Sequence, residues 1–478
     1  MRLPEFIKKM LVELSDTGFE AYVVGGSVRD WLLGQEPKDW DITTKARPEQ
    51  ILKLFIDAKY ENRFGTVIVP FRTDDGTVTD VVEITTYRSE QGYSDRRHPD
   101  EVIFEDKLEN DLARRDFTIN ALAMDASGKL VDIFGGEKDL KKKIIRTVGE
   151  PEDRFKEDAL RLLRAVRLSV QLNFSIEPKT ERAMLKLAGS IKFVAAERIR
   201  DELIKILSSD KPAEGIDLLH RLKLLQYILP EVEEGVGVEQ SHHHTLPVYE
   251  HNLASLKHCP NQQWPVRLAA LLHDVGKPKT RKIIDNAATF YNHEIVGARM
   301  VEKIMKRLKF SAEDSTRVVN LVRNHMFYYN VDEVTAASVR RLIKKVGEEN
   351  LSDLIDLRVA DRLGSGVAKA MPYKLRHLQY MMDKVRHDPI SVKMLKLNGD
   401  DLMKLLKIEP GPKIGSILDC LLAEVIEDPA LNEKKYLQKR SKELNELSLN
   451  ELRVKAKEII QEKRSEDDEK IKKDYYVK

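Results

Sequence analysis

The segment Gly25-Gly26-Ser27-Val28-Arg29-Asp30 is followed closely by Asp39-Trp40-Asp41. Adjacent glycines permit a turn whose backbone can approach a phosphate group closely. Asp39 and Asp41 are two residues apart, so on a strand both project from one face while Trp40 points to the other. Two carboxylates on one face suit a pair of Mg²⁺ ions about 4 Å apart. This stretch therefore predicts metal-assisted nucleotidyl transfer in an N-terminal α/β domain.

Strand and helix signals separate along the chain. Residues 21–24, 66–71 and 78–87 are rich in β-branched residues and predict strands. From residues 157–172 onward, including 193–207, apolar residues recur at helical spacing and strand signals nearly vanish. The sequence therefore predicts an α+β fold, with a mixed-sheet head followed by an all-helical remainder.

The composition limits the class of protein. A chain of 478 residues is too long for one hydrophobic core, so several domains are expected. Charged residues make up 33% and aromatic residues 6%, which is typical of a soluble, helix-rich protein. The net charge of +2 shows no global basic excess, so any contact with nucleic acid must come from local patches.

The chain carries no sign of export or membrane insertion. Cys259 and Cys420 cannot form a disulfide framework and favour a reducing compartment. Residues 1–19 have the charge spacing of an amphipathic helix, unlike a signal peptide. No apolar run approaches membrane-spanning length. We expect a cytoplasmic protein with no membrane partner, and the sequence leaves its oligomeric state open.

Further motifs follow in order. They are Arg114-Arg115-Asp116-Phe117-Thr118-Ile119-Asn120, the glycine-containing stretch 125–136, the arginine-rich stretch 154–167 and Ala196-Glu197-Arg198-Ile199. With the two N-terminal motifs, this series resembles the bacterial-type (class II) tRNA nucleotidyltransferase and poly(A) polymerase family. The resemblance covers residues 20 to about 235, and several of its motifs are individually specific.

The resemblance implies a polymerase-beta-like head that binds Mg²⁺ and adds nucleotides to tRNA. Asp39 and Asp41 are the expected catalytic residues and metal ligands, and Glu83 on the predicted strand 78–87 is a candidate third carboxylate. Residues 125–136 look like the family's head-to-neck hinge, and 196–199 look like its neck-stabilising helix start. The expected nucleotide-binding residues are Gly25, Gly26, Arg29, Arg115, Asp116, Asn120, Asp158, Arg161, Arg164 and Arg167.

Asp158 and Arg161 offer a way to select a base without a template. On the predicted helix 157–172 they are i and i+3 and share a face. An ionised Asp only accepts hydrogen bonds and Arg only donates them, which matches the amino donor and ring acceptor of cytosine and adenine. Uracil and guanine would leave both groups unpaired, at about 1–3 kcal/mol each. The alternative is an ordinary surface ion pair worth about 1 kcal/mol or less.

The segment 87–104 bears on the extent of addition. It is polar and includes Arg88, Gly92, Tyr93 and Pro99. In the family that this chain resembles, enzymes that add only the two cytidines typically lack such a loop, so addition of the full CCA from CTP and ATP is expected. An enzyme that adds only A would keep the same motifs. A poly(A) polymerase usually has a long basic extension, unlike the charge-balanced end of this chain.

A second site is predicted further along. The segment Leu271-Leu272-His273-Asp274-Val275-Gly276-Lys277 resembles the signature of the HD phosphohydrolase superfamily. Such a site would activate water for phosphoester hydrolysis, and imidazoles with carboxylates suit Mn²⁺, Ni²⁺, Fe²⁺ or Zn²⁺. The alternative is a structural role, in which a lone His-Asp pair caps a helix. The ligands that the family order implies are His251, His273, Asp274, His293, His325 and Asp361.

The remaining histidines receive no role, and the basic patches have two possible explanations. His242-His243-His244 and His387-Asp388 receive no role. Basic patches near the neck and in the tail can follow an RNA backbone, although a solvated helix face explains each patch equally well. The rival for the whole chain is an HD phosphohydrolase whose head only binds RNA. The predicted domains are a head at 1–145, a neck and body at 146–240, an HD domain at 241–375 and a tRNA-binding tail at 376–478.

Overall fold

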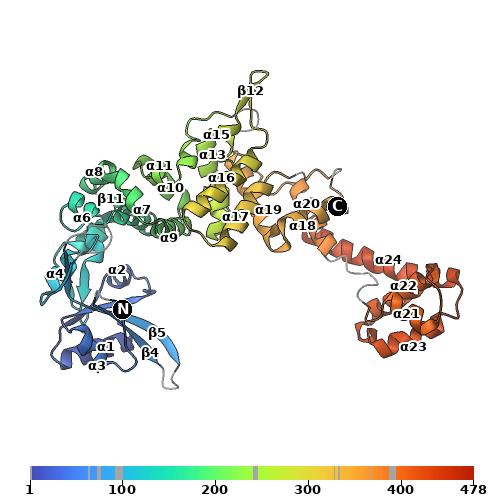
Figure 1. The fold of residues 1–478 in the computed structure, drawn as a ribbon, viewed down its shortest axis with the longest axis horizontal. Helices are drawn as coiled ribbons and strands as arrows, with labels where there is room; N and C mark the ends of the chain where they lie inside the picture. The colour runs from blue at the N-terminus through green and yellow to red at the C-terminus, as the bar shows by residue number, and fades with distance from the viewer. Residues whose placement is uncertain are drawn as a thin grey trace. The chain divides into compact units, whose positions relative to one another are not determined.

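The computed structural model describes residues 3–62, 65–72, 77–91, 101–240, 246–327, 329–331, 334–367, 369–386 and 395–477. Residues 92–100 of the segment 87–104, the histidine run 242–244 and the pair 387–388 lie outside the described residues. The chain forms two compact units (Figure 1). The first comprises Met1–Arg323 and Asp356–Val367, and the second comprises Asn324–Ile355 and Ala368–Lys478.

A seven-stranded mixed sheet forms the head, in the order β3-β4-β5-β2-β1-β8-β9. Neighbours are antiparallel except β2 and β5, which run parallel. The predicted strands 21–24, 66–71 and 78–87 are confirmed within one or two residues. The sheet consists of β1 (Ala21–Val24), β2 (Trp40–Thr44), β3 (Lys59–Asn62), β4 (Thr66–Arg72), β5 (Val78–Thr86), β8 (Leu122–Met124) and β9 (Leu130–Asp132).

Helices and one ribbon complete the head. The N-terminal segment forms the predicted amphipathic helix, which buries Ile7, Leu11 and Leu14. Tyr87, at the end of β5, is fully buried in a cluster with Leu112 of α4. The elements are α1 (Glu5–Asp16), α2 (Gly26–Leu32), α3 (Pro48–Leu54), β6 (Arg88–Gln91), β7 (Glu101–Phe104), α4 (Leu108–Ala113), the 3₁₀ turn η1 (Thr118–Asn120) and α5 (Gly136–Lys142).

The neck is helical apart from one short parallel pair of strands. It comprises β10 (Ile144–Ile145), α6 (Pro151–Glu157), α7 (Leu160–Leu172), β11 (Ser175–Ile176), α8 (Pro178–Leu187), η2 (Ala188–Phe193), α9 (Ala196–Leu207), α10 (Pro212–Arg221), α11 (Leu225–Ile228) and α12 (Pro230–Glu233).

The sequence predicts one continuous helix over 157–172, and this prediction is wrong at Asp158. Asp158 has extended backbone angles, φ −141° and ψ 105°, and separates α6 from α7. Its carboxylate accepts a hydrogen bond from the backbone N–H of Leu160 at 3.0 Å. An aspartate that bonds the first backbone donors of a following helix favours a chain break over helix continuation. Asp158 and Arg161 therefore do not share one helix face.

The helices that follow belong mainly to the first unit, and one of them leads directly into the His-Asp doublet. Arg267 of α14 is 8% exposed, and its Nη1 donates to the carbonyls of Leu207 and Ser209 at 2.7 and 2.8 Å, which joins this part to the end of α9. The elements are α13 (Val248–Lys257), α14 (Trp264–Leu272), α15 (Lys277–Thr280), the hairpin β12 (Lys282–Ile284) and β13 (Ala287–Thr289), α16 (His293–Arg307), α17 (Ala312–Asn324) and α19 (Leu351–Gly364).

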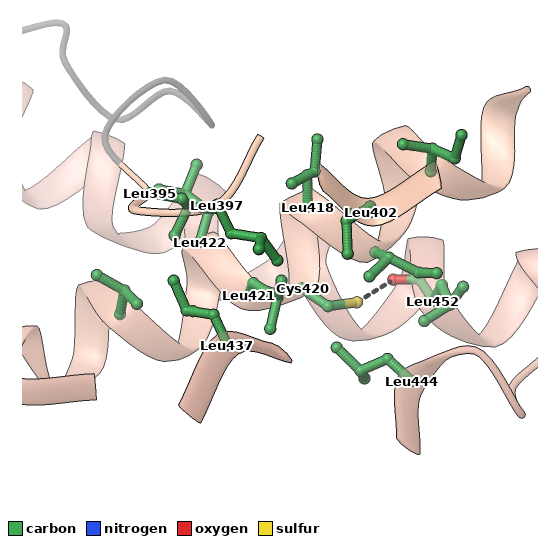
Figure 2. Packing of buried hydrophobic residues seen from close by; sticks show 13 residues of the cluster. Leu395, Leu397, Leu402, Leu418, Cys420, Leu421, Leu422, Leu437, Leu444 and Leu452 are labelled. Carbon is green, nitrogen blue, oxygen red and sulfur yellow. Dashed lines mark hydrogen bonds between the residues drawn. The ribbon is translucent and has the colours of Figure 1, made fainter. Parts of the chain in front are cut away.

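The second unit has its own apolar core in the C-terminal region (Figure 2). Leu421 and Leu437 are fully buried there, and the Cys420 thiol donates to the carbonyl of Leu452 at 3.2 Å. The elements are α18 (Ala336–Val346), η3 (Glu348–Asn350), α20 (Tyr373–Arg386), α21 (Gly399–Leu406), α22 (Pro412–Glu427), η5 (Pro429–Leu431), α23 (Lys434–Leu444) and α24 (Leu449–Asp474).

The mixed head followed by helices confirms the predicted fold class. Among the described residues, none of the helices combines the length and the apolar character needed to cross a bilayer.

Candidate active sites

Strand register brings three acidic residues of the head together. Asp41 on β2 pairs with Glu83 on the parallel strand β5, so their side chains leave the same face of the sheet. Asp39 is exposed and precedes β2, whereas Trp40 is buried on the opposite side. Burial raises the pKa of Glu83, and the charges of Asp41 and Asp39 raise it further. The three carboxylates therefore act on one another electrostatically.

Asp41 experiences both burial and opposing charges. Burial raises the pKa of its carboxyl, Arg115 lowers it, and Asp39 raises it again. Acids that repel one another at one place are stabilised by a bound cation, and oxygen ligands of this kind suit Mg²⁺. The donor set of the head therefore fits a divalent ion.

Gly25 lies directly against this acidic group. Its φ of +80° and ψ of −137° are readily adopted only by glycine. A Cβ at this position would lie 2.8 Å from Nη1 of Arg115 and 3.6 Å from Oδ2 of Asp41. The glycine is thus required by its backbone conformation and by the close approach of Arg115. Gly26 then begins α2.

A chain of hydrogen bonds joins the start of α2 to the neck. Arg29 Nη1 donates to Asn120 Oδ1 at 2.7 Å, and Asn120 Nδ2 donates to Asp116 Oδ1 at 3.0 Å. Arg164 Nε donates to the other oxygen of Asp116 at 2.8 Å. Burial would raise the pKa of Asp116, but the Arg164 guanidinium and the bond from Asn120 hold it well below its usual range. Four of the predicted nucleotide-binding residues therefore form one connected network.

The predicted base-reading pair is arranged differently from expectation. The Asp158 carboxylate accepts from Nη1 and Nη2 of Arg198, at 3.1 and 2.7 Å. Arg161 forms an ion pair with Glu157, and its Nη2 donates to the carbonyl of Arg114 at 3.3 Å. Each member of the pair is thus held by a different protein partner.

Arg167, on α7, forms hydrogen bonds with other residues of the neck. Its Nε donates to Glu202 of α9 at 2.6 Å, and its Nη1 donates to Gln171 at 2.9 Å. Glu202 is 3% exposed.

Sequence reasoning missed two residues of the head and neck, Asp111 and Glu202, and the pairing role of Arg198. Arg198 stands in the recognised segment 196–199, but its partner Asp158 lies 40 residues earlier. Periodicity within one helix cannot reveal such a pair.

The second site gathers histidines and acids in a dry environment. His251 on α13 and His273 after α14 are both 0% exposed, and Asp274 is 2% exposed. The Nε2 atoms of His251 and His273 lie 3.1 Å apart. His251 Nε2 lies 3.3 Å from Asp361 Oδ1, and His293 Nε2 lies 3.2 Å from Asp274 Oδ1. One ligand atom each from His251, His273 and Asp274 lies close enough to the others to hold one metal ion.

Backbone carbonyls orient two of these imidazoles. His273 Nδ1 lies 2.8 Å from the carbonyl of Ala270, and His293 Nδ1 lies 2.8 Å from that of Phe290. With Nδ1 as donor in the neutral imidazole, the Nε2 lone pair is available to a metal ion next to Asp274. Burial would raise the pKa of Asp274, but His273 and Lys277 hold it well below its usual range.

Asp361 borders His251 and His273 in this group, and His325 is buried as well. Burial would raise the pKa of Asp361, but a bond from His251 and the charges of His273 and Arg358 lower it. His325 follows α17 and is 2% exposed, in the second compact unit. Its role as a ligand remains a prediction.

Comparisons with known proteins identify the regions that contain the two candidate sites. Residues 21–146 match the family "Poly A polymerase head domain", residues 173–235 match "Probable RNA and SrmB- binding site of polymerase A", and residues 248–365 match "HD domain". The solved CCA-adding enzyme of Bacillus stearothermophilus in complex with CTP is similar, with 26% identity and a TM-score of 0.61, over 92% of this chain and 97% of that chain.

Full-length relatives place the chain in a family. It is 34% identical to the CCA-adding enzyme of Ligilactobacillus salivarius, over 93% of this chain and 98% of that protein. It is 36% identical to the A-adding tRNA nucleotidyltransferase of Deinococcus radiodurans, over 84% of this chain and 90% of that protein. With its nucleotidyltransferase head and its HD domain, the chain belongs to the tRNA nucleotidyltransferase family, which includes the CCA-adding enzymes.

Proposed function

We propose that this protein adds CCA to the 3′ end of tRNA, using CTP and ATP and no nucleic-acid template. The observation that carries the proposal is the group of Asp39, Asp41 and Glu83 beside Gly25 and Arg115. Acidic metal ligands next to a glycine turn and an arginine suit a nucleoside triphosphate. The similar enzyme of Bacillus stearothermophilus was solved with CTP, which supports this substrate.

The head residues have distinct proposed roles. Asp39 and Asp41, with Glu83 as a third ligand, hold Mg²⁺, which supplies the Lewis acidity that activates the RNA 3′ hydroxyl and neutralises the leaving pyrophosphate. Gly25 and Gly26 let the backbone approach the triphosphate. Two further groups complete the site: Arg29 and Arg115 bind phosphate oxygens, and Asp116 and Asn120 bind the ribose.

Base selection rests on Asp158 and Arg161. We propose that they read the base from the turn before α7 and from its first helical turn. Arg198 orients the Asp158 carboxylate, whose oxygens accept hydrogen bonds. Glu157 does the same for the donors of Arg161. Arg164 and Arg167 extend the arginine row on α7.

The proposed domains follow from these sites. We assign 1–145 to the head, 146–240 to the neck and body, 241–375 to the HD domain and 376–478 to a tail that binds tRNA. Four exposed lysines on α5 or directly after it offer a surface for an RNA backbone: Lys138, Lys141, Lys142 and Lys143. The buried thiols of Cys259 and Cys420 suit the cytoplasm.

Addition of A alone is the second candidate, and its support is the A-adding relative with 36% identity. A poly(A) polymerase is the third. Incubation with a tRNA that lacks its 3′ end, with CTP, with ATP and with both, followed by sequencing of the product ends, separates them. CCA addition requires both nucleotides and stops after three residues. An A-only enzyme extends a tRNA that already ends in CC but leaves the shorter tRNA unchanged. A long A tract would identify a polymerase.

We further propose that the HD domain hydrolyses phosphates at RNA ends, such as a 2′,3′-cyclic phosphate. The donors of His251, His273 and Asp274, with His293, His325 and Asp361, suit Mn²⁺, Ni²⁺, Fe²⁺ or Zn²⁺. Bound metal supplies an activated water for the reaction. Metal-depleted protein supplied with each ion separately, on a cyclic-phosphate RNA end, tests this proposal. No hydrolysis with any of the ions would contradict it.

A further inference from the structure

We infer that Asp111 is a positioning residue, which holds Arg115 beside the nucleotide site and prevents it from pairing with Asp41. The inference rests on the proposed role of Asp41 as a metal ligand. Asp111 lies on α4 and is 0% exposed, so it cannot itself contact a substrate. A buried carboxylate must be compensated by nearby donors, and these donors show what Asp111 does.

The Asp111 carboxylate joins the end of α4 to β2. Its Oδ1 accepts from Nε and Nη2 of Arg114 at 3.0 and 2.8 Å. Its Oδ2 lies 3.2 Å from the donating Oγ1 of Thr43 and 3.7 Å from Nη2 of Arg115. Thr43 is fully buried on β2, two residues after Asp41. Asp111 thus fixes Arg115 relative to the strand that carries the proposed metal ligand.

Arg115 lies between two acids. The Cβ position of Gly25 is 2.8 Å from Arg115 Nη1 and 3.6 Å from Asp41 Oδ2, so both groups border the same point. Arg115 Nη1 also donates to the carbonyl of Asn120 at 3.4 Å. Among the contacts of the described residues, the ion pair of Arg115 is with Asp111, and none is with Asp41. Arg115 therefore pairs with the buried Asp111 through one nitrogen, and its other terminal nitrogen lies near the same point as the proposed metal ligand.

This arrangement has a consequence for metal binding. A guanidinium placed within reach of a carboxylate pairs with it unless another anion holds the cation. When Asp111 carries its negative charge, Arg115 pairs with Asp111. Asp41 then stays available to a divalent ion. With a neutral residue at position 111, Arg115 loses this ion pair while Asp41 still borders the same point near Gly25. Arg115 then competes with the metal.

Mn²⁺ binding tests the inference directly. Free Mn²⁺ is measured by electron paramagnetic resonance on full-length protein, with His273→Ala in every variant to weaken the HD site. Asp41→Ala in the same background defines the contribution of the head. We expect Asp111→Asn to weaken Mn²⁺ binding by about five- to tenfold when Arg115 is present, and by less than about twofold when Arg115→Gln is also present. Equal losses in both backgrounds, or no loss, overturn the inference.

Asp139→Asn is a matched control. Asp139 is also buried, and it accepts from Thr118 Oγ1 at 2.7 Å and from Arg146 Nε at 3.0 Å, away from Asp41. We expect it to lower the melting temperature as Asp111→Asn does, with unchanged Mn²⁺ affinity. An equal loss of Mn²⁺ affinity in this control would show that the effect is general destabilisation and would overturn the inference.

A milder variant covers the case in which Asp111→Asn does not fold. Thr43→Val removes one hydrogen bond from Asp111 and keeps its charge. It should weaken Mn²⁺ binding by about twofold when Arg115 is present. It should not weaken binding when Arg115→Gln is also present. No loss of Mn²⁺ binding with Arg115 present contradicts the inference. A wild-type protein that fails to extend truncated tRNA would overturn the proposed function, whereas these Mn²⁺ comparisons would still be readable.

Discussion

The head presents its acids on an open sheet surface, whereas the HD domain encloses its ligands in a helical core. Asp39 is exposed and Asp41 is partly buried, while His251 and His273 are fully buried. The open site depends on parallel register between β2 and β5, and the closed site depends on the packing of several helices around Asp274. Two parts of one unit thus gather candidate metal ligands by different means.

The difference lies in how charge is balanced. In the HD domain, Asp274 is surrounded by imidazoles and by Lys277, whose Nζ lies 2.6 Å from Asp274 Oδ2. The buried charges therefore compensate one another before metal binds. In the head, Asp41 and Glu83 have raised pKa values because burial and like charges act together. We expect the head site to need a cation, and the triphosphate that accompanies it, for full charge balance.

Asp41→Ala should have the largest effect. It removes the acid at the centre of the head site, and we expect nucleotide addition to fall on the order of a thousandfold or more. Gel assays of tRNA extension and of cyclic-phosphate hydrolysis measure both activities. Asp80→Ala, an exposed acid on the same strand as Glu83, is the control. A parallel loss of hydrolysis would show that the two regions are not independent.

His273→Ala should produce the converse pattern. It removes a fully buried ligand, so we expect at least about a hundredfold loss of HD metal affinity and of hydrolysis. Metal content by mass spectrometry and the same two assays measure the result. His258→Ala, an exposed histidine of the same region, should retain metal. Retained metal content in His273→Ala would contradict the proposed ligand set.

The next largest effect should be a change in base selection. Arg161→Ala removes the proposed donor, and discrimination against UTP should weaken by about five- to 150-fold, which corresponds to one unpaired buried group. Arg198→Ala should weaken it less, because Asp158 remains and loses only its orientation. Competition between nucleotides in tRNA extension measures both, with the exposed neighbour Glu197→Ala as control. Unchanged discrimination in Arg161→Ala would refute the template role.

The smallest effect concerns acid stability. Since the pKa of Asp116 is lowered below its ordinary value of 3.8, its bonds contribute stability above that pH and are lost as the pH falls toward the folded-state pKa. Asp116→Asn should cost about 1–3 kcal/mol at pH 7 and flatten the decline in stability below pH 4. Urea denaturation from pH 7 to 3 measures this. An equally steep decline in the variant would contradict it.

Local sequence patterns were sufficient for several elements. β-branched runs predicted β1, β4 and β5, because strand preference is expressed within a few residues. Asp39-Trp40-Asp41 predicted acids on one face, because alternation is a property of the strand itself. The order of His251, His273, Asp274 and Asp361 likewise pointed to ligands that the structure brings together.

The helix break at Asp158 could not be predicted from apolar spacing, which continues through it. What decides the break is a long-range ion pair with Arg198 and a local bond to Leu160. Periodicity describes one helix at a time and contains no information about such partners.

By itself, the sequence determined the residue types of the candidate sites: a glycine turn beside two acids, an arginine row, and a His-Asp doublet with further histidines. Only the tertiary structure decided which partner each charge has. It placed Glu83 beside Asp41 by strand pairing, Arg198 on Asp158, and the buried Asp111 behind Arg115. The physical reason is that side-chain type is local, whereas compensation of a buried charge depends on distant segments that folding brings together.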